Sequence, residues 1–469
     1  MNSPADATVA STPEAQAHRQ GQHQRPLKRA ICLAGGGPAA GLHIGVLEGL
    51  EANRIKFDRE HDIWALSCIG AWVGIIYNQA TTDREVQETY EFFRGVFRDD
   101  KSFRSFPMNT IFAPDWAGNA EAMWDFLLEP RNYKNAFLPR EIMKSFMHTM
   151  SALRGMSAIR RRTRRLNAEE FEEVEEFAKF SEGDFNRWVL NDVLAVNPAV
   201  RLLTALIYKS EITGLARLYY PDSKFLNDIK FKELMDKPDK PGEPKKPKKP
   251  YIFHNAWNLT QQDLQLFSNR DPGPPSNAKY KRITPQSLCA CSALPFIEQT
   301  VVIDGQTYCE GALKDTVNFQ DLLKDHHNPP HDPLDEIWIS RIVDAHQVRP
   351  PKDLHDALAN LCEQFAATVG EDDVKLFLCH VRENQNDAKA FKGTIVGIPT
   401  CSDISFEWSH RNLEAGRRNG RAAAQIAFDA YTAAGGPRPH GNLRIIGELE
   451  RRRRREEITA ARRAAYARS

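Results

Sequence analysis

The 469-residue sequence contains no run of about eighteen uninterrupted apolar residues, so we expect no membrane-spanning helix. Residues 1–27 are polar and lack the apolar segment of a secretory signal, and we expect them to form a disordered tail. The net charge is only +1 at pH 7, which argues against a global attraction to nucleic acid or to membranes. These absences together favour a cytoplasmic protein.

The cysteines show no paired spacing, which argues against a disulfide framework and fits free thiols in a reducing cytosol. Cys289 and Cys291 are too close together and too unaccompanied to form a zinc site. Residues 325–332 are rich in His and Asp but lack the H-E-x-x-H spacing of a helical metal site, and we expect a surface loop there. We therefore expect neither a metal nor a cofactor. The eight cysteines lie at positions 32, 68, 289, 291, 309, 362, 379 and 401.

Short apolar runs alternate with helical patterns near the N-terminus. A β-like run at 29–34 leads through a glycine-rich loop into a helical pattern that ends near residue 52, and a second run at 62–68 precedes a helix at 69–80. This order predicts a three-layer α/β domain with a mostly parallel sheet between helices. Further expected elements are a hairpin at 301–309 with an Asp304-Gly305 turn, strands at 335–343 and 373–381, and a helix at 411–433.

The remaining chain divides by composition. Within an α/β domain at 28–325, residues 81–235 are charged and helical in pattern, and we interpret them as a helical insertion that includes a helix at 198–208. Residues 236–250 form a Pro/Lys linker without core-forming side chains. We expect 326–447 to be a C-terminal extension packed on the core, and 448–469 to be a basic tail.

The loop Gly35-Gly36-Gly37 lies between a predicted strand and a predicted helix. Backbone N–H groups in such a loop can bind an anion, which makes a phosphate cradle or an oxyanion hole. A P-loop is disfavoured because no G-K-[ST] follows, and a dinucleotide fingerprint would need glycine where Ala40 stands. A tight turn without a ligand is the structural alternative.

Residues 62–74 predict a buried strand, a sharp turn and a helix of small residues. In G-x-S-x-G hydrolases such a turn presents the nucleophile. Here Cys68 occupies the nucleophile position, and Leu66 replaces the first glycine. Cys68 is therefore either a thiol nucleophile or an inert buried cysteine. Ser67 is a weaker candidate, because a shift of one residue along a strand places its side chain on the opposite side.

Three segments in this order resemble the patatin-like phospholipases: GGGPAAGLHIGVLEGL at 35–50, the strand–turn–helix at 62–74, and EQTVVIDGQTYCEGALKDTVN at 298–318. The stretch 290–295 also resembles the family, and 403–430 resembles an extension found in some bacterial members. The resemblance implies a Ser–Asp dyad with a glycine-rich oxyanion hole. It places Cys68 at the nucleophile, Glu310 at the acid, and the oxyanion donors among Gly35, Gly36, Gly37 and Ile69.

Several positions depart from the family pattern. Cys68 stands in place of Ser, Glu310 in place of Asp, and Ala39 and Ala40 stand where many members have a basic residue and a glycine. A helix N-terminus lowers the pKa of a thiol, whereas a neighbouring carboxylate raises it, so the sequence leaves the balance open. Asp304 is an alternative acid, although its hairpin position favours a structural role. His43 is expected to be a packed histidine rather than a base.

The resemblance implies acyl hydrolysis or acyl transfer on a lipid-like ester or thioester, with Cys68 attacking and Glu310 acting as base. An intracellular polyester depolymerase, a thioesterase and a catalytically impaired lipid-binding protein are alternatives. Two arginine clusters, at 154–165 and 451–468, fit solvated helices or tails. Peripheral contact with an anionic membrane is the second interpretation of these clusters. Nucleic-acid binding is the third, because no aromatic residues are interleaved with the charge.

Overall fold

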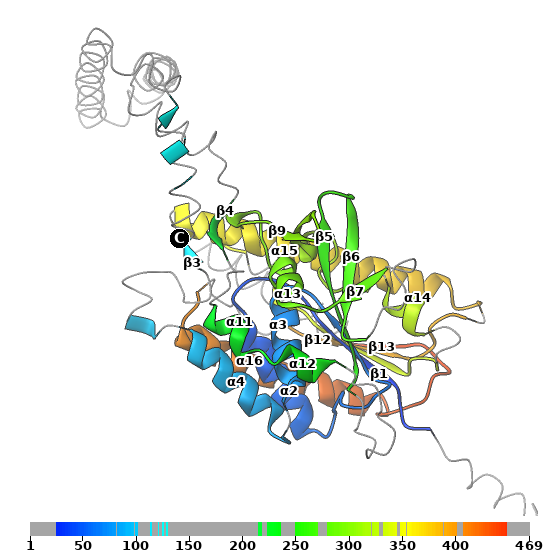
Figure 1. Cartoon of the computed structure of the whole chain (residues 1–469). Coiled ribbons are helices and arrows are strands. Elements are labelled where there is room, and N and C mark those ends of the chain that lie inside the picture. The colour runs from blue at the N-terminus through cyan, green and yellow to red at the C-terminus, as the bar shows by residue number, and fades with distance from the viewer. Residues whose placement is uncertain are drawn as a thin grey trace, which may run out of the picture. The chain divides into compact units, whose positions relative to one another are not determined.

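The computed structural model shows an α/β protein (Figure 1). It describes residues 25–101 apart from 81 and 98, short stretches within 113–129, residues 214–217, 223–235, 249–270, and 279–447 apart from 320, 328–331, 345–347, 353, 388 and 401–406. The chain forms two compact units. The first comprises 1–111, 221–292 and 301–469, and the second comprises 112–220 and 293–300.

A ten-stranded sheet is the centre of the first unit. Six of its strands are parallel and follow the order β13–β12–β11–β1–β2–β5. The inner strands are buried along almost their whole length, as expected of a parallel sheet covered on both faces. The six strands are β1 (Arg29–Leu33), β2 (Ile63–Leu66), β5 (Tyr251–Asn258), β11 (Glu336–Ser340), β12 (Thr394–Ile398) and β13 (Arg444–Ile446).

Strand β5 continues beyond the end of β2 and gains antiparallel partners. On one side it pairs with β6 (Asp263–Ser268), which β7 (Tyr280–Arg282) follows. On the other side its last three residues pair with β10 (Gln306–Glu310), which forms a hairpin with β9 (Val301–Ile303). Strand β10 therefore lies beside β5 just beyond the carboxyl end of β2.

Helices cover both faces of the sheet and complete the three layers (Figure 1). The helices α2, α3 and α16 cover one face, whereas α15 covers the other. Shorter helices and a 3-10 turn, η4, connect these layers and the strands. The helical elements of the first unit are α2 (Ala40–Ala52), α3 (Ile69–Asn78), α4 (Glu85–Val96), α11 (Lys224–Asp228), α12 (Phe231–Leu234), α13 (Pro285–Cys291), η4 (Gly311–Leu313), α14 (Leu322–His326), α15 (Leu354–Glu383) and α16 (His410–Ala433).

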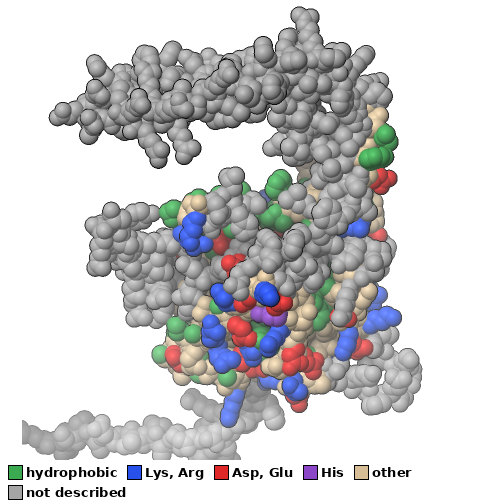
Figure 2. Space-filling model, turned by 90° about the vertical axis from the view of Figure 1, so that its left-hand side faces the viewer, with side chains coloured by type: hydrophobic (Ala, Val, Ile, Leu, Met, Phe, Trp, Pro, Cys, Tyr) green, Lys and Arg blue, Asp and Glu red, His purple; other side chains and the backbone are tan. Residues whose placement is uncertain are grey.

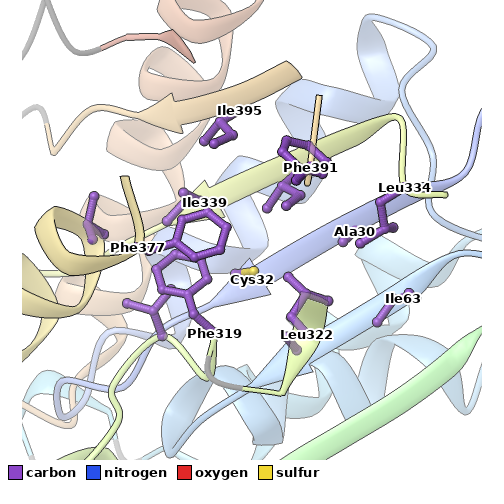
Figure 3. Packing of buried hydrophobic residues seen from close by; sticks show 14 of the residues in the cluster. Ala30, Cys32, Ile63, Phe319, Leu322, Leu334, Ile339, Phe377, Phe391 and Ile395 are labelled. Carbon is purple, nitrogen blue, oxygen red and sulfur yellow. The ribbon is translucent and has the colours of Figure 1, made fainter. Parts of the chain in front are cut away.

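A hydrophobic cluster fills the layer between the sheet and α15 (Figure 3). Alternate residues of β1, Ala30 and Cys32, point into it because successive side chains of a strand face opposite sides. Phe319 stacks on Phe377 of α15, with ring centroids 4.2 Å apart and planes inclined by 8°. This cluster joins the segment that follows β10 to the C-terminal half of α15.

Helices α2 and α16 pack backbone to backbone through glycines. A Cβ atom built at Gly45 would lie 2.0 Å from the carbonyl oxygen of Arg417, and one at Gly420 would lie 2.0 Å from that of Leu42. Only glycine permits such an approach. Glu48 of α2 adds a bidentate ion pair with Arg417, at 2.8 and 3.1 Å. The C-terminal part of the chain is thus fixed against the first helix of the fold.

The predicted α/β class and mostly parallel sheet are confirmed, as are the strands near 29–34, 62–68 and 335–343 and the helix near 411–433. The hairpin is also confirmed, with positive φ at both Asp304 and Gly305. The strand predicted at 373–381 is wrong, because these residues lie inside α15. The buried residues of this segment, Val374, Phe377 and Val381, follow the spacing of one helix face.

The second unit contains a small sheet of β3 (Ala113–Pro114), β4 (Gly214–Arg217) and β8 (Phe296–Glu298). The second unit covers fewer residues than the insertion expected at 81–235, because α4, α11 and α12 belong to the first unit. The predicted helix at 198–208, both arginine clusters, and most of the tail 1–27, of the linker 236–250 and of the tail 448–469 lie outside the described residues.

The described surface of the first unit carries charges of both signs. Figure 2 shows basic and acidic side chains interspersed on the described part of one face, so no patch of a single sign dominates that part. No described helix combines the length and the apolar character needed to cross a bilayer.

Candidate active site

Cys68 lies in a strained turn between β2 and α3. It is the N-cap residue of α3, with φ 47° and ψ −123°, and is only 7% exposed. A positive φ is unfavourable for a residue with a side chain and persists only where the surroundings enforce it. Directly after this turn α3 approaches β1 closely, because a Cβ atom at Gly70 would lie 2.2 Å from the carbonyl oxygen of Leu33. The helix can therefore start close against β1 only with glycine at position 70.

The sheet register brings Glu310 to Cys68. Leu66 of β2 pairs with His254 of β5, so Cys68 comes two residues later at the level of Ala256. Glu310, the last residue of β10, pairs with Ala256. Glu310 raises the pKa of the Cys68 thiol through its charge and as a hydrogen-bond acceptor, as expected of neighbouring side chains. Two residues that are far apart in the sequence thus lie side by side, and both are buried.

The glycine-rich loop borders this pair. A Cβ atom at Gly35 would lie 2.8 Å from Ala312 Cβ and 2.9 Å from Cys68 Cβ, so this position has no room for a side chain. The Gly36 backbone lowers the pKa of the Cys68 thiol by hydrogen bonding, and both Gly36 and Gly37 have positive φ. The loop therefore directs at least one backbone N–H group toward the thiol.

Gly35 has a different role from the one expected. Its N–H donates to the carbonyl oxygen of Thr316, at 3.2 Å, so it is not directed at the thiol. Its contribution is the close approach of the loop to Cys68 and to the turn after Glu310. Ile69 is the first residue of α3, and N–H groups in the first turn of a helix have no acceptor within the helix.

Burial dominates the electrostatics of the pair. It raises the pKa of the Cys68 thiol well above its ordinary value of 9.0, and the Glu310 carboxylate raises it further. Burial also raises the pKa of Glu310 from 4.5 to about 7, against the opposing effect of the hydrogen bond from Cys68. Desolvation and the carboxylate therefore outweigh the hydrogen bonding of the Gly36 backbone, which lowers the thiol pKa. The resting site contains a neutral thiol beside a carboxyl group that ionises near neutral pH.

Polar residues that the sequence did not single out hold the turn in place. Asn255 of β5 accepts a hydrogen bond from Ser67 Oγ at 2.9 Å and donates one to the carbonyl oxygen of Asp315 at 2.8 Å. Asn318 donates to the carbonyl oxygen of Leu66 at 3.1 Å. Ser67 is therefore a structural residue that faces β5. Only the topology reveals these roles, because the partners come from separate parts of the chain.

The other candidates lie apart from the pair or serve the fold. Asp304 is at the tip of the β9–β10 hairpin, with its side chain 79% exposed. His43 is fully buried between Ser340 Oγ at 3.0 Å and the carbonyl oxygen of Ala34 at 2.9 Å, and burial lowers its pKa to about 4. Asp325 accepts hydrogen bonds from Lys279 and Tyr280.

Metal and disulfide chemistry find no support in the part of the chain that the structure describes. No group of three or more potential ligands gathers among these residues. None of the seven cysteines described there forms a disulfide.

Comparison with known proteins identifies the family. The model of the patatin-like phospholipase family matches residues 31–323, which is more than half of the chain. No curated protein sequence is significantly similar to this chain. Among solved structures, the chain is similar to one described as the crystal structure of VipD from Legionella pneumophila, with 10% sequence identity, a TM-score of 0.31 and coverage of 85% of this chain and 67% of that chain. The chain belongs to the patatin-like phospholipase family.

Proposed function

We propose that the protein is a lipid acyl hydrolase or acyltransferase that cleaves ester or thioester bonds, with Cys68 as nucleophile and Glu310 as general base. The observation that carries this proposal is that Cys68, at a strained turn, and Glu310 lie together beside the glycine-rich loop, where a Cβ atom at Gly35 would be 2.9 Å from Cys68 Cβ and 3.8 Å from Glu310 Oε1. The family supports the lipid-like substrate, since its members are typically ester hydrolases. The sulfur nucleophile is the feature specific to this chain.

The first half-reaction would begin with the neutral thiol. As the sulfur attacks the carbonyl carbon, Glu310 takes the thiol proton, so a free thiolate need not form in the buried site. The substrate oxygen becomes an oxyanion, and N–H groups of Gly36, Gly37 and Ile69 stabilise it. Collapse of the intermediate breaks the bond to the leaving alcohol or thiol, which receives the proton from Glu310. The product is a thioester on Cys68.

The second half-reaction would regenerate the thiol. Glu310 removes a proton from water, the oxygen attacks the thioester, and a carboxylic acid leaves while Cys68 recovers its proton. An alcohol, thiol or amine can replace water, which gives acyl transfer. A thioester is more reactive toward such acceptors than an oxygen ester, so the sulfur nucleophile favours transfer more than a serine would.

A lipid-binding protein without turnover is the second candidate. The observation that favours it is the raised pKa of Cys68, because burial and Glu310 both disfavour the reactive thiolate. This candidate predicts lipid binding that thiol alkylation does not change.

Mass spectrometry of the intact protein tests the proposal. The protein and its Cys68→Ala and Cys68→Ser variants are incubated with short- and long-chain p-nitrophenyl esters, and adducts are mapped to peptides. We expect an acyl adduct on Cys68 and turnover that disappears in Cys68→Ala. Cys379, which is exposed on α15, reports non-enzymatic acylation. An adduct confined to Cys379, or neither adduct nor turnover, would contradict the proposal and favour the lipid-binding candidate.

A further inference from the structure

A second sulfur contacts the backbone of Cys68. The Cys68 N–H donates a hydrogen bond to Cys291 Sγ at 3.0 Å. Cys291 is the last residue of α13 and is fully buried. The Asn255 backbone lowers the pKa of the Cys291 thiol by hydrogen bonding, so it adjoins the same sulfur. One side chain thus adjoins both the turn that holds Cys68 and the strand beside it.

The other N–H groups of the turn show why this contact matters. The Ser67 N–H donates to the carbonyl oxygen of Leu33 at 3.1 Å, and the Gly70 N–H donates to that of Ser67 at 2.9 Å. The Cys68 N–H is directed at Cys291, which leaves the Ile69 N–H as the one donor of residues 67–70 that we assign to a substrate oxygen. Without the sulfur, the buried N–H of Cys68, itself the strained residue, would lose its acceptor.

Asn255 links the Cys68 turn to the segment that follows Glu310. The Asn255 side chain binds Ser67 on one side and the carbonyl oxygen of Asp315, five residues after Glu310, on the other. Its backbone adjoins the Cys291 sulfur. A rotation of the peptide before Cys68 would therefore change the direction of the thiol and of the Ile69 N–H together.

We propose that Cys291 is a positioning residue for Cys68, whose sulfur holds the Cys68 N–H and thereby directs the thiol toward Glu310 and the Ile69 N–H toward the substrate oxygen. The inference rests on the proposed function for its effect on turnover. Its effect on the geometry of Cys68 is independent of that function. An acceptor atom at position 291, rather than only its volume, is the required property.

Substitutions at 291 separate these two properties. Cys291→Ala removes the acceptor, Cys291→Ser supplies an oxygen acceptor, and Cys291→Val keeps much of the volume without an acceptor and replaces the Ala variant if that one does not fold. Cys289→Ala is the matched control, because Cys289 is equally buried and lies two residues earlier on α13. The readouts are kcat and KM for a p-nitrophenyl ester and the rate at which iodoacetamide alkylates Cys68, mapped by peptide mass spectrometry.

We expect Cys291→Ala to lower kcat by about 10- to 100-fold with little change in KM, because a misplaced reacting group costs rate rather than affinity. Cys291→Ser should recover most of kcat, and Cys289→Ala should resemble the unmodified protein. The rate of Cys68 alkylation should rise in Cys291→Ala and not in Cys289→Ala.

Equal effects of Cys291→Ala and Cys289→Ala, or none in either, would overturn the inference. If the unmodified protein hydrolyses no ester, the alkylation rates still decide: a change specific to position 291 supports the positioning role although the proposed function has failed. If esters are hydrolysed but position 291 affects neither kcat nor alkylation, the positioning role fails alone.

Discussion

Replacing Glu310 with glutamine should stabilise the protein while it abolishes the proposed catalysis. The carboxyl group is buried, and its pKa rises from 4.5 to about 7 on folding, chiefly through burial. At a pH between 4.5 and about 7, Glu310 keeps its proton in the folded protein and has lost it in the unfolded chain. Stability therefore falls as the pH rises through this window and levels off above about pH 7. An amide of similar size does not titrate and escapes this cost.

The shift in pKa sets the size of the effect. One pKa unit corresponds to about 1.4 kcal/mol, so Glu310→Gln should gain about 2 to 3 kcal/mol relative to the unmodified protein between pH 5 and pH 8. Urea unfolding, followed by the fluorescence of the buried Trp64, Trp72 and Trp338, measures this difference at both pH values. Ester turnover at pH 8 should fall by about 10²- to 10⁴-fold.

Glu48→Gln is the control, because its effect on stability should depend on pH in the opposite direction to that of Glu310→Gln. Burial raises the pKa of Glu48, but hydrogen bonds from Arg417 and Arg421 outweigh it and lower the pKa below its ordinary value. This carboxylate stabilises the fold above its unfolded pKa, and the stabilisation is lost as the pH falls. Glu48→Gln should therefore destabilise the protein at pH 8 and less so in acid. A Glu310→Gln effect that is independent of pH would refute the reasoning.

Three further predictions concern packing and pH. Gly45→Ala should destabilise the protein by about 1–3 kcal/mol or more in urea unfolding, because the new Cβ would meet Arg417 O, whereas Gly95→Ala in α4 meets nothing within 4 Å and should be neutral or stabilising. Phe377→Ala should cost about 3–5 kcal/mol by the same measurement, and a loss below 1 kcal/mol would contradict the stacked core in Figure 3. In the proposed reaction, kcat/KM should rise with pH through about 7 as Glu310 ionises, and a flat pH profile would exclude it as base.

The sequence was most informative where local rules determine structure. The glycines at 35–37, the strand–turn–helix around Cys68 and the Asp304-Gly305 hairpin each depend on a few neighbouring residues, and the structure contains all three features. The pairing of Glu310 with Cys68 was suggested by family resemblance. Its physical basis, the register of β2 and β10 along β5, needed the structure.

Other features depend on contacts between distant segments. Residues 373–381 belong to a helix and not to the expected strand, because the periodicity of so short a segment does not distinguish a strand from part of a buried helix. Cys291 and Asn255 could not be connected to Cys68 until α13 and β5 were placed beside the turn. The balance of effects on the thiol pKa also required burial, which spacing along the chain does not provide.

The position of β1 has a consequence for biosynthesis. One neighbour of β1 is β2, which follows closely in the chain, but the other is β11, where Glu336 pairs with Arg29, 307 positions earlier. At about 5–20 residues per second, translation would need about 15 to 60 s to reach the second neighbour. During that interval the nascent chain exposes the apolar edge of β1 that later pairs with β11. An unpaired apolar edge can pair with another chain, so the edge of β1 is a site of aggregation until β11 has been synthesised.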